Sequence, residues 1–86
     1  MQSTQPISDA IRNFVISHFP LARKRGVTDS DLLLETGVLD SLGILDVVQF
    51  IETEFGLHID DDELLPENFQ SIQNLSEFVQ KKRGAA

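Results

Sequence analysis

The stretch from Asp40 to Gly56 constrains the fold most, because it has the pattern of one amphipathic helix with a marked start and end. Asp40 is a favourable N-terminal cap, since its carboxylate can accept hydrogen bonds from the free N–H groups of the first turn. Gly56 suits the helix end, because glycine adopts the left-handed conformation without a Cβ clash. Apolar residues between them follow helical spacing and predict one buried face, formed by Ile44, Val47, Val48, Ile51 and Phe55.

The start of this helix carries residues that a buried face does not require. Leu42 and Leu45 lie off the predicted core face, beside Ser41. A helix that only had to fold would be more polar here, so we expect both leucines to be exposed and to serve binding. A phosphate ester on Ser41 would be favoured by the free N–H groups and the positive helix end, although Asp40 opposes that anion.

The charges of the chain exclude several kinds of partner. The net charge is −7 over 86 residues, and the segment from Gly26 to Gln80 has no Lys or Arg. Nucleic acids and anionic membrane surfaces require a basic footprint, so neither is expected as a partner. The sequence shows no signal peptide and no apolar run of membrane length, and we predict a cytoplasmic protein. It also has no cysteine, so thiol chemistry must come from an attached group.

The first part of the chain predicts one helix followed by a long connection. Helical spacing predicts a helix to about Phe19 that is capped by Thr4 and ended by Pro20. Residues 23–26 have the composition of a solvated turn. We expect the three leucines at 32–34 to pin the connection onto the core, because a structureless loop of this length is rare in a small domain.

The last part of the chain predicts a short helix and then a long one. The acidic run 60–63 is typical of a helix N-terminus, and we expect the leucines at 64–65 to face inward before Pro66 ends this helix. Ser71 is a candidate cap for a last helix with basic residues at its end, positions 81–83. The predicted fold is all-α, a small four-helix bundle with three longer helices and one short helix.

Metal and catalytic interpretations of this sequence are weak. The acidic run 60–63 lacks the alternating ligands, central glycine and distal glutamate of a calcium loop, so no metal site is expected. Neither His18 nor His58 has a neighbouring residue in the sequence that would complete a catalytic triad. A non-enzymatic function is therefore predicted.

The residues around Ser41 resemble a known family. Gly37-Val38-Leu39-Asp40-Ser41-Leu42, followed by an acidic helix that ends in Glu54-Phe55-Gly56, is similar to the acyl carrier protein family. In that family the serine of Asp-Ser-Leu carries a 4′-phosphopantetheine arm, derived from coenzyme A, whose thiol holds an acyl group as a thioester. The resemblance covers about residues 7–83. It implies that Ser41 is the cofactor attachment residue and that the chain is a carrier, a substrate of other enzymes.

The resemblance also implies partners and a surface that binds them. The partners are a phosphopantetheinyl transferase, an acyl- or aminoacyl-loading ligase, and downstream acyltransferase or synthase enzymes. Exposed leucines would fill pockets on these enzymes while carboxylates meet a basic rim. The predicted partner-binding residues are Asp40, Leu42, Leu45, Asp46, Gln49, Glu52, Asp61 and Glu63.

Three positions depart from the carriers of fatty acid synthesis. Gly43 replaces a residue that is usually acidic, at a cost of up to about 1 kcal/mol relative to alanine. Gln49 stands where methionine is common, and Thr53 replaces an acidic residue. Aminoacyl, polyketide and unusual acyl groups therefore stay open as cargo.

The length predicts one domain over residues 1–86, with an ordered core at about 6–83, and the resemblance implies that it is a carrier domain; we expect a free-standing monomer. One alternative function is left open by the residues themselves. A non-carrier, acidic helical adaptor could bind a basic protein through the same helix face.

Overall fold

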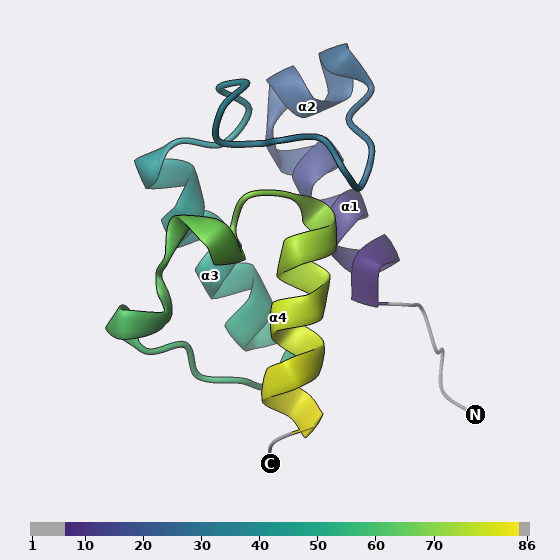
Figure 1. The fold of residues 1–86 in the computed structure, drawn as a ribbon. Helices are drawn as coiled ribbons and strands as arrows, with labels where there is room; N and C mark the ends of the chain where they lie inside the picture. Colours follow the sequence, from purple (N-terminus) through teal and green to yellow (C-terminus); the bar gives the residue numbers. More distant parts are fainter. Residues whose placement is uncertain (1–6, 85–86) are drawn as a thin grey trace, which may run out of the picture.

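The computed structural model describes residues 7–84, and all regular structure within them is helical. The elements are α1 (Ile7–His18), α2 (Pro20–Arg25), α3 (Ser41–Phe55), the 3-10 turns η1 (Asp61–Glu63) and η2 (Pro66–Asn68), and α4 (Ile72–Gly84). Figure 1 shows α3 and α4 running in the same direction, with α1 antiparallel to both. The predicted all-α bundle of four helices, three of them long, is confirmed, but the short helix is α2 and not the one predicted after Gly56. The predicted cap at Thr4 lies outside the described residues.

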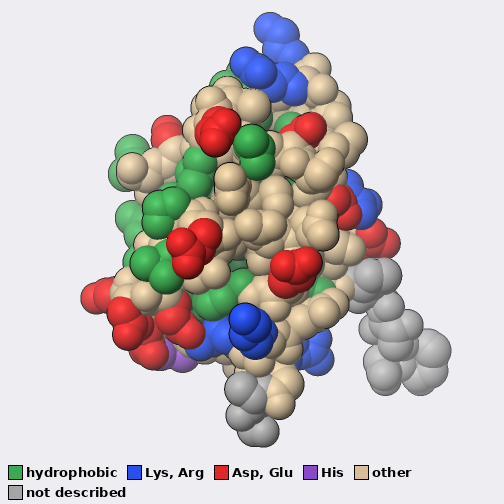
Figure 2. Space-filling view, viewed as in Figure 1, with side chains coloured by type: hydrophobic (Ala, Val, Ile, Leu, Met, Phe, Trp, Pro, Cys, Tyr) green, Lys and Arg blue, Asp and Glu red, His purple; other side chains and the backbone are tan. Residues whose placement is uncertain are grey.

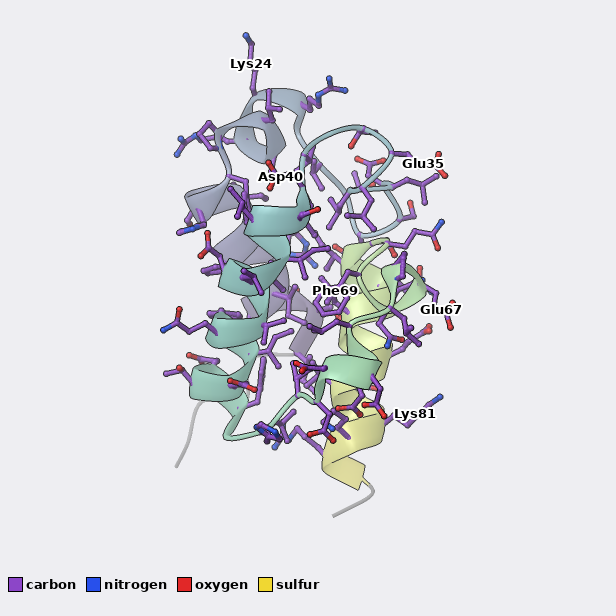
Figure 3. The ribbon with its side chains drawn as sticks, turned by 90° about the vertical axis from the view of Figure 1, so that its left-hand side faces the viewer. Lys24, Glu35, Asp40, Glu67, Phe69 and Lys81 are labelled. Atoms are coloured by element: carbon purple, nitrogen blue, oxygen red, sulfur yellow. The ribbon has the colours of Figure 1, made fainter. Side chains whose placement is uncertain are left out.

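The core is formed where the apolar faces of the three long helices meet. Ile11 and Val15 of α1, together with Val47 and Ile51 of α3, are completely buried. Phe69, which precedes α4, is also completely buried and lies between α3 and α4 in Figure 3. The predicted core face of α3 is correct: its other members, Ile44, Val48 and Phe55, pack against the core while partly exposed.

Pro20 begins a helix in addition to ending one. α1 stops at His18, and α2 starts at Pro20, where the missing N–H of proline costs nothing in a first helical turn. The expectation of a solvated turn at 23–26 is therefore wrong for its first three residues, which form the last turn of α2. Ala22 is completely buried and anchors α2 to the core. Gly26 ends the helix in the left-handed conformation with φ 64°.

The connection between α2 and α3 is bonded to α1 and to the start of α4. Leu33 is completely buried, and its N–H donates to the carbonyl of Gln70 at 2.8 Å. Asp29 accepts a 2.7 Å hydrogen bond from Arg12 Nε, and its carbonyl accepts one from Gln73 N at 2.9 Å. The leucines do pin the connection, with one exception: Leu32 is exposed.

The short helix predicted after α3 is replaced by two 3-10 turns. Gly56 ends α3 with φ 66°, as predicted. The acidic run does cap a helical turn, because Asp60 N donates to Glu63 Oε1 and Glu63 N donates to the Asp60 carbonyl, each at 2.9 Å. Leu64 is half-buried, but Leu65 is exposed, which corrects the expectation that both face inward. Pro66 starts η2, again as the first residue of a turn.

The beginning of α4 agrees with its prediction. Ser71 Oγ accepts a 3.1 Å hydrogen bond from Asn74 N, so this serine caps the helix. Ile72, Leu75 and Val79 are completely buried, and the three basic residues 81–83 lie in the last turn.

Candidate functional site

Ser41 is the first residue of α3 and is exposed to solvent. Asp40 precedes it in an extended conformation, and its Oδ1 accepts a 2.8 Å hydrogen bond from Gly43 N. The Asp40 carbonyl accepts the bond from Ile44 N at 2.9 Å. Among the described residues, no acceptor bonds the N–H groups of Ser41 and Leu42. The helix start therefore combines a reachable hydroxyl with two free N–H groups.

The chain changes from buried to exposed within a few residues around Ser41. Val38 and Leu39 are 5% and 2% exposed, and Leu39 N donates to the Leu33 carbonyl at 3.0 Å. Leu42 and Leu45 are 76% and 56% exposed, which confirms their predicted exposure. A buried segment therefore precedes Ser41 and fixes its position, and two solvent-exposed leucines follow it.

Close packing at this helix start leaves little room for a side chain at position 43. It is buried, and a Cβ atom at this position would lie 2.9 Å from Leu39 Cδ1 and 2.9 Å from Phe19 Cε1. Real Cβ contacts are essentially never that short. The interpretation of Gly43 as a weak point of helix propensity is therefore incomplete. Its missing side chain lets α3 begin directly against Phe19, a neighbour that the sequence pattern did not reveal.

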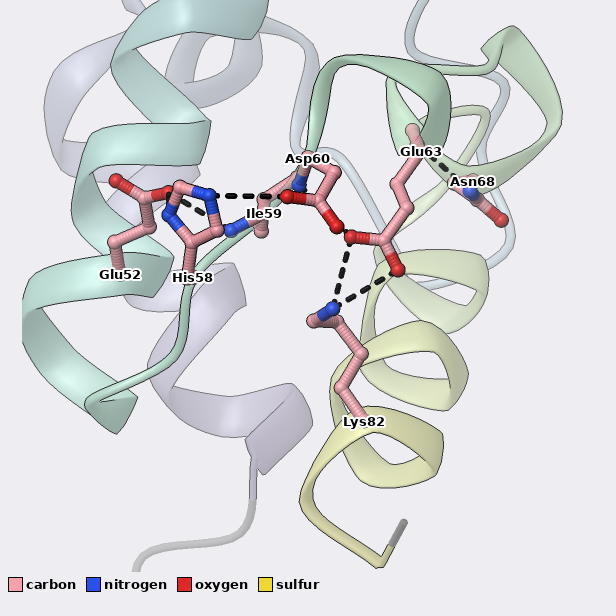
Figure 4. A network of polar contacts seen from close by, with 7 residues as sticks. All are labelled: Glu52, His58, Ile59, Asp60, Glu63, Asn68 and Lys82. Atoms are coloured by element: carbon pink, nitrogen blue, oxygen red, sulfur yellow. Dashed lines mark hydrogen bonds and ion pairs between the residues drawn. The ribbon is translucent and has the colours of Figure 1, made fainter. Parts of the chain in front are cut away.

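Besides Asp40, three carboxylates assigned to partner binding already have partners inside the molecule. Asp46 Oδ2 lies 3.1 Å from His18 Nε2, and the His18 ring stacks on Phe14 with centroids 4.9 Å apart. Glu52 accepts a 2.8 Å hydrogen bond from Ile59 N and lies 3.6 Å from His58 Nδ1 (Figure 4).

Glu63 is the third carboxylate, and it is held from two sides (Figure 4). Lys82 Nζ donates to both of its oxygens at 2.8 and 2.9 Å, and Asp60 N donates to Oε1 at 2.9 Å. The pKa of Glu63 is lowered first by the Lys82 hydrogen bond and next by that backbone N–H. This carboxylate closes the loop onto α4 in addition to any role at the surface.

The remaining predicted partner-binding residues are exposed. Asp61 lies in η1, where Figure 2 shows carboxylates gathered on one side of the molecule. Gln49 lies on α3 beside a shallow groove of about 250 Å³. The groove is lined by Phe14, His18, Asp46, Gln49, Phe50 and Thr53. Two of these residues, Phe14 and Phe50, stack on each other with ring centroids 4.2 Å apart.

His18 and His58 have structural surroundings. His58 is 80% exposed at its side chain and lies 3.0 Å from Asp60 Oδ1, while His18 bridges α1 to α3 through Asp46. Within residues 7–84, no group of three potential ligands is placed to hold a metal ion. No helix in the same range has the length and apolar character needed to cross a bilayer.

Comparison with known proteins assigns this site to a family. Residues 9–79 match the family described as the phosphopantetheine attachment site. An acyl carrier protein of Buchnera aphidicola is 30% identical over 77 residues, which cover 90% of this chain and 95% of that protein. The chain belongs to the acyl carrier protein family. A probable acyl carrier protein, PigG, of Serratia sp. is 30% identical over 80% of this chain and 79% of its own length.

A solved structure supports the same family assignment. The solution structure of a holo acyl carrier protein from Nitrosomonas europaea superimposes with a TM-score of 0.76 at 30% identity. The match covers 93% of this chain and 99% of that one. The predictions of an acyl carrier fold, a phosphopantetheine group and a non-catalytic carrier function are confirmed. Partners of this acyl carrier protein therefore include a phosphopantetheinyl transferase and acyl-processing enzymes as classes.

Proposed function

We propose that Ser41 is the residue that receives phosphopantetheine. The observation that carries this proposal is its position: it is an exposed serine in the first turn of a helix. Ser71 and Ser76 are buried, with 4% and 6% exposure. Ser17 and Ser30 are exposed but lie at the end of α1 and in a turn. Ser8 also lies in a first helical turn, that of α1, but it is half-buried. Among residues 7–84, Ser41 is the only exposed serine in the first turn of a helix.

The surroundings of Ser41 fit a phosphodiester. The free N–H groups of Ser41 and Leu42 point along the helix axis toward its start, where the positive end of the dipole favours an anion. Asp40 carries a like charge, but its Oδ1 is occupied by Gly43 N, which draws that carboxylate toward the backbone. When attached, the arm supplies a terminal thiol that carries the acyl group as a thioester. The protein itself supplies an anchored hydroxyl and a surface for delivery.

Intact-mass spectrometry with site mapping tests this assignment. The protein is incubated with coenzyme A and a broad-specificity phosphopantetheinyl transferase. We expect one mass gain of a phosphopantetheine group in the wild type and in the control Ser17→Ala, and no gain in Ser41→Ala. A gain that persists in Ser41→Ala, or one mapped to another serine, would show that the attachment residue is wrong.

We further propose that Leu42 and Leu45 are the apolar anchors for partner enzymes. They are exposed on the helix that starts at Ser41, so an enzyme acting on that serine must cover them. Gln49 and Asp61 extend this surface, and Asp40, Asp46, Glu52 and Glu63 add negative potential around it while keeping their internal contacts.

The leucine proposal is tested with the same transferase assay. Leu45→Ala removes apolar area that a partner would bury, which is expected to cost about 1 kcal/mol and to raise the KM for the carrier about fivefold. Leu65→Ala is the control, because Leu65 is also exposed but lies outside α3, just before η2. Equal KM changes for the two variants would show that Leu45 is not part of the docking surface.

A further inference from the structure

The last turn of α2 carries three consecutive cations, Arg23, Lys24 and Arg25, all of them exposed. Within residues 7–84 none of them forms an ion pair with a carboxylate. Two other cations hold the fold together, since Arg12 pairs with Asp29 and Lys82 pairs with Glu63, while Lys81 and Arg83 at the end of α4 form no ion pair among the described residues. Three adjacent exposed cations without an internal partner are available to a partner outside the molecule.

This cationic end of α2 (residues 23–25) lies at the same end of the molecule as the start of α3. Phe19, which precedes α2, packs against Gly43 in the first turn of α3. Ala22 is completely buried and holds α2 in place. Figure 3 shows Lys24 projecting from the tip of the molecule beyond Asp40, and Figure 2 shows the basic side chains gathered at that tip. The cluster is therefore displayed on a fixed element near Ser41.

The charge distribution selects the kind of partner. Membrane-binding polybasic segments have about 4–8 cations, more than this turn holds. Outside the cluster, the chain has four cationic residues and fourteen acidic ones. The rest of the molecule is therefore negative and would repel an anionic lipid surface or a nucleic acid. A folded protein with a local acidic patch can meet the cluster without meeting that repulsion. Leu21, 43% exposed on the same helix, adds an apolar contact of the kind that protein interfaces use.

We propose that the cationic end of α2 is a second docking contact, which receives carboxylates on the phosphopantetheinyl transferase. This inference depends on the proposed function, because an enzyme that acts directly on the Ser41 hydroxyl must sit over the first turn of α3 and hence beside α2. Contacts of opposite sign on the two sides of Ser41 define the orientation of the enzyme around that serine. A carrier surface of a single charge sign would allow the enzyme to rotate about Ser41 without losing electrostatic attraction.

Steady-state kinetics with coenzyme A and a broad-specificity phosphopantetheinyl transferase test the proposal. The variant Lys24→Gln/Arg25→Gln is compared with Lys81→Gln/Arg83→Gln, which removes one lysine and one arginine from the exposed end of α4. Both variants have the same net charge, and glutamine preserves helix propensity. We expect the α2 variant to raise the KM for the carrier about fivefold, with kcat and melting temperature unchanged, and the α4 variant to change KM less than twofold.

The difference between the two variants should diminish as salt is raised, because exposed charge pairs are screened. If the enzyme docks on acidic residues alone, removing cations will instead lower KM, and that result overturns the proposal. Equal KM values for the two variants also overturn the proposal. Binding to phosphatidylserine vesicles is measured in parallel; if the α2 variant loses vesicle binding while its KM is unchanged, the cluster serves a membrane and the proposal is wrong. Failure of the attachment proposal looks different, since the wild type would then show no modification at Ser41.

Discussion

Replacing Gly43 by alanine is expected to destabilise this protein, although alanine is the better helix former. A Cβ at this position would meet Leu39 Cδ1 and Phe19 Cε1, each at 2.9 Å, and Asp40 Oδ1 at 3.3 Å. Leu39 is only 2% exposed, so its methyl group has little room to move away. Phe19 is half-buried, so either its ring or the start of α3, which carries the free N–H groups beside Ser41, must shift.

Two opposing terms determine the size of the effect. Alanine in place of glycine inside a helix is worth about 1 kcal/mol of stability. Overpacking a filled site by one methyl group typically costs about 1–3 kcal/mol. The balance is a net loss of about 1 kcal/mol, which lowers the melting temperature of a domain of this size by about 5 °C.

Urea and thermal unfolding followed by circular dichroism measure this loss. Thr53→Ala is the control, because Thr53 is exposed on the same helix and should follow propensity alone, gaining about 0.5 kcal/mol. Shortening the opposing ring in Phe19→Leu should make the combined variant more stable than the sum of the single changes predicts, by about 1 kcal/mol. Stabilisation of Gly43→Ala by 0.5 kcal/mol or more, to about the extent of propensity, would refute the packing argument.

Three further substitutions test other parts of the fold. Asp40→Ala removes the side-chain cap bonded to Gly43 N and should reduce the free energy of unfolding by about 1 kcal/mol in urea titrations; an unchanged value would mean that water replaces the cap. The pKa of Asp29 is lowered by its hydrogen bond to Arg12, so the stability from this pair is present above about pH 4 and is lost as pH falls through the lowered pKa. Asp29→Asn should therefore cost at most about 1 kcal/mol at pH 7, with both groups partly exposed, and nothing in acid; a pH-independent loss contradicts this. Phe69→Ala empties a completely buried site and should cost about 3–5 kcal/mol, enough to leave much of the chain unfolded by NMR at 37 °C; a well-dispersed spectrum would contradict it.

Local patterns predicted the ends of the helices well. The caps at Asp40, Gly56 and Ser71 are found where the sequence indicated them, because capping is a contact between residues a few positions apart. The exposure of Leu42 and Leu45 was also predictable, since helical periodicity alone places them off the core face.

A proline can end one helix or begin the next, and the sequence analysis considered only the first outcome for Pro20. Pro20 was expected to stop a helix, and it also starts α2. The missing N–H is harmful within a helix and harmless in its first turn, so both outcomes satisfy the local chemistry. Burial of Ala22 against the core favours the helix, and that contact joins residues whose proximity the sequence does not show.

The sequence by itself determined that a helix begins beside Ser41, which faces of it are apolar, and that the surrounding charge is negative, because each is a property of neighbouring residues. Only the tertiary structure showed that Gly43 lies against Leu39 and Phe19, with little room for a side chain. It also decided that Glu63 bonds to Lys82, 19 positions away, while the cations of α2 bond to no carboxylate among the described residues. Packing and ion pairing join residues far apart in the chain, so which groups are free to meet a partner becomes known only once the chain is folded.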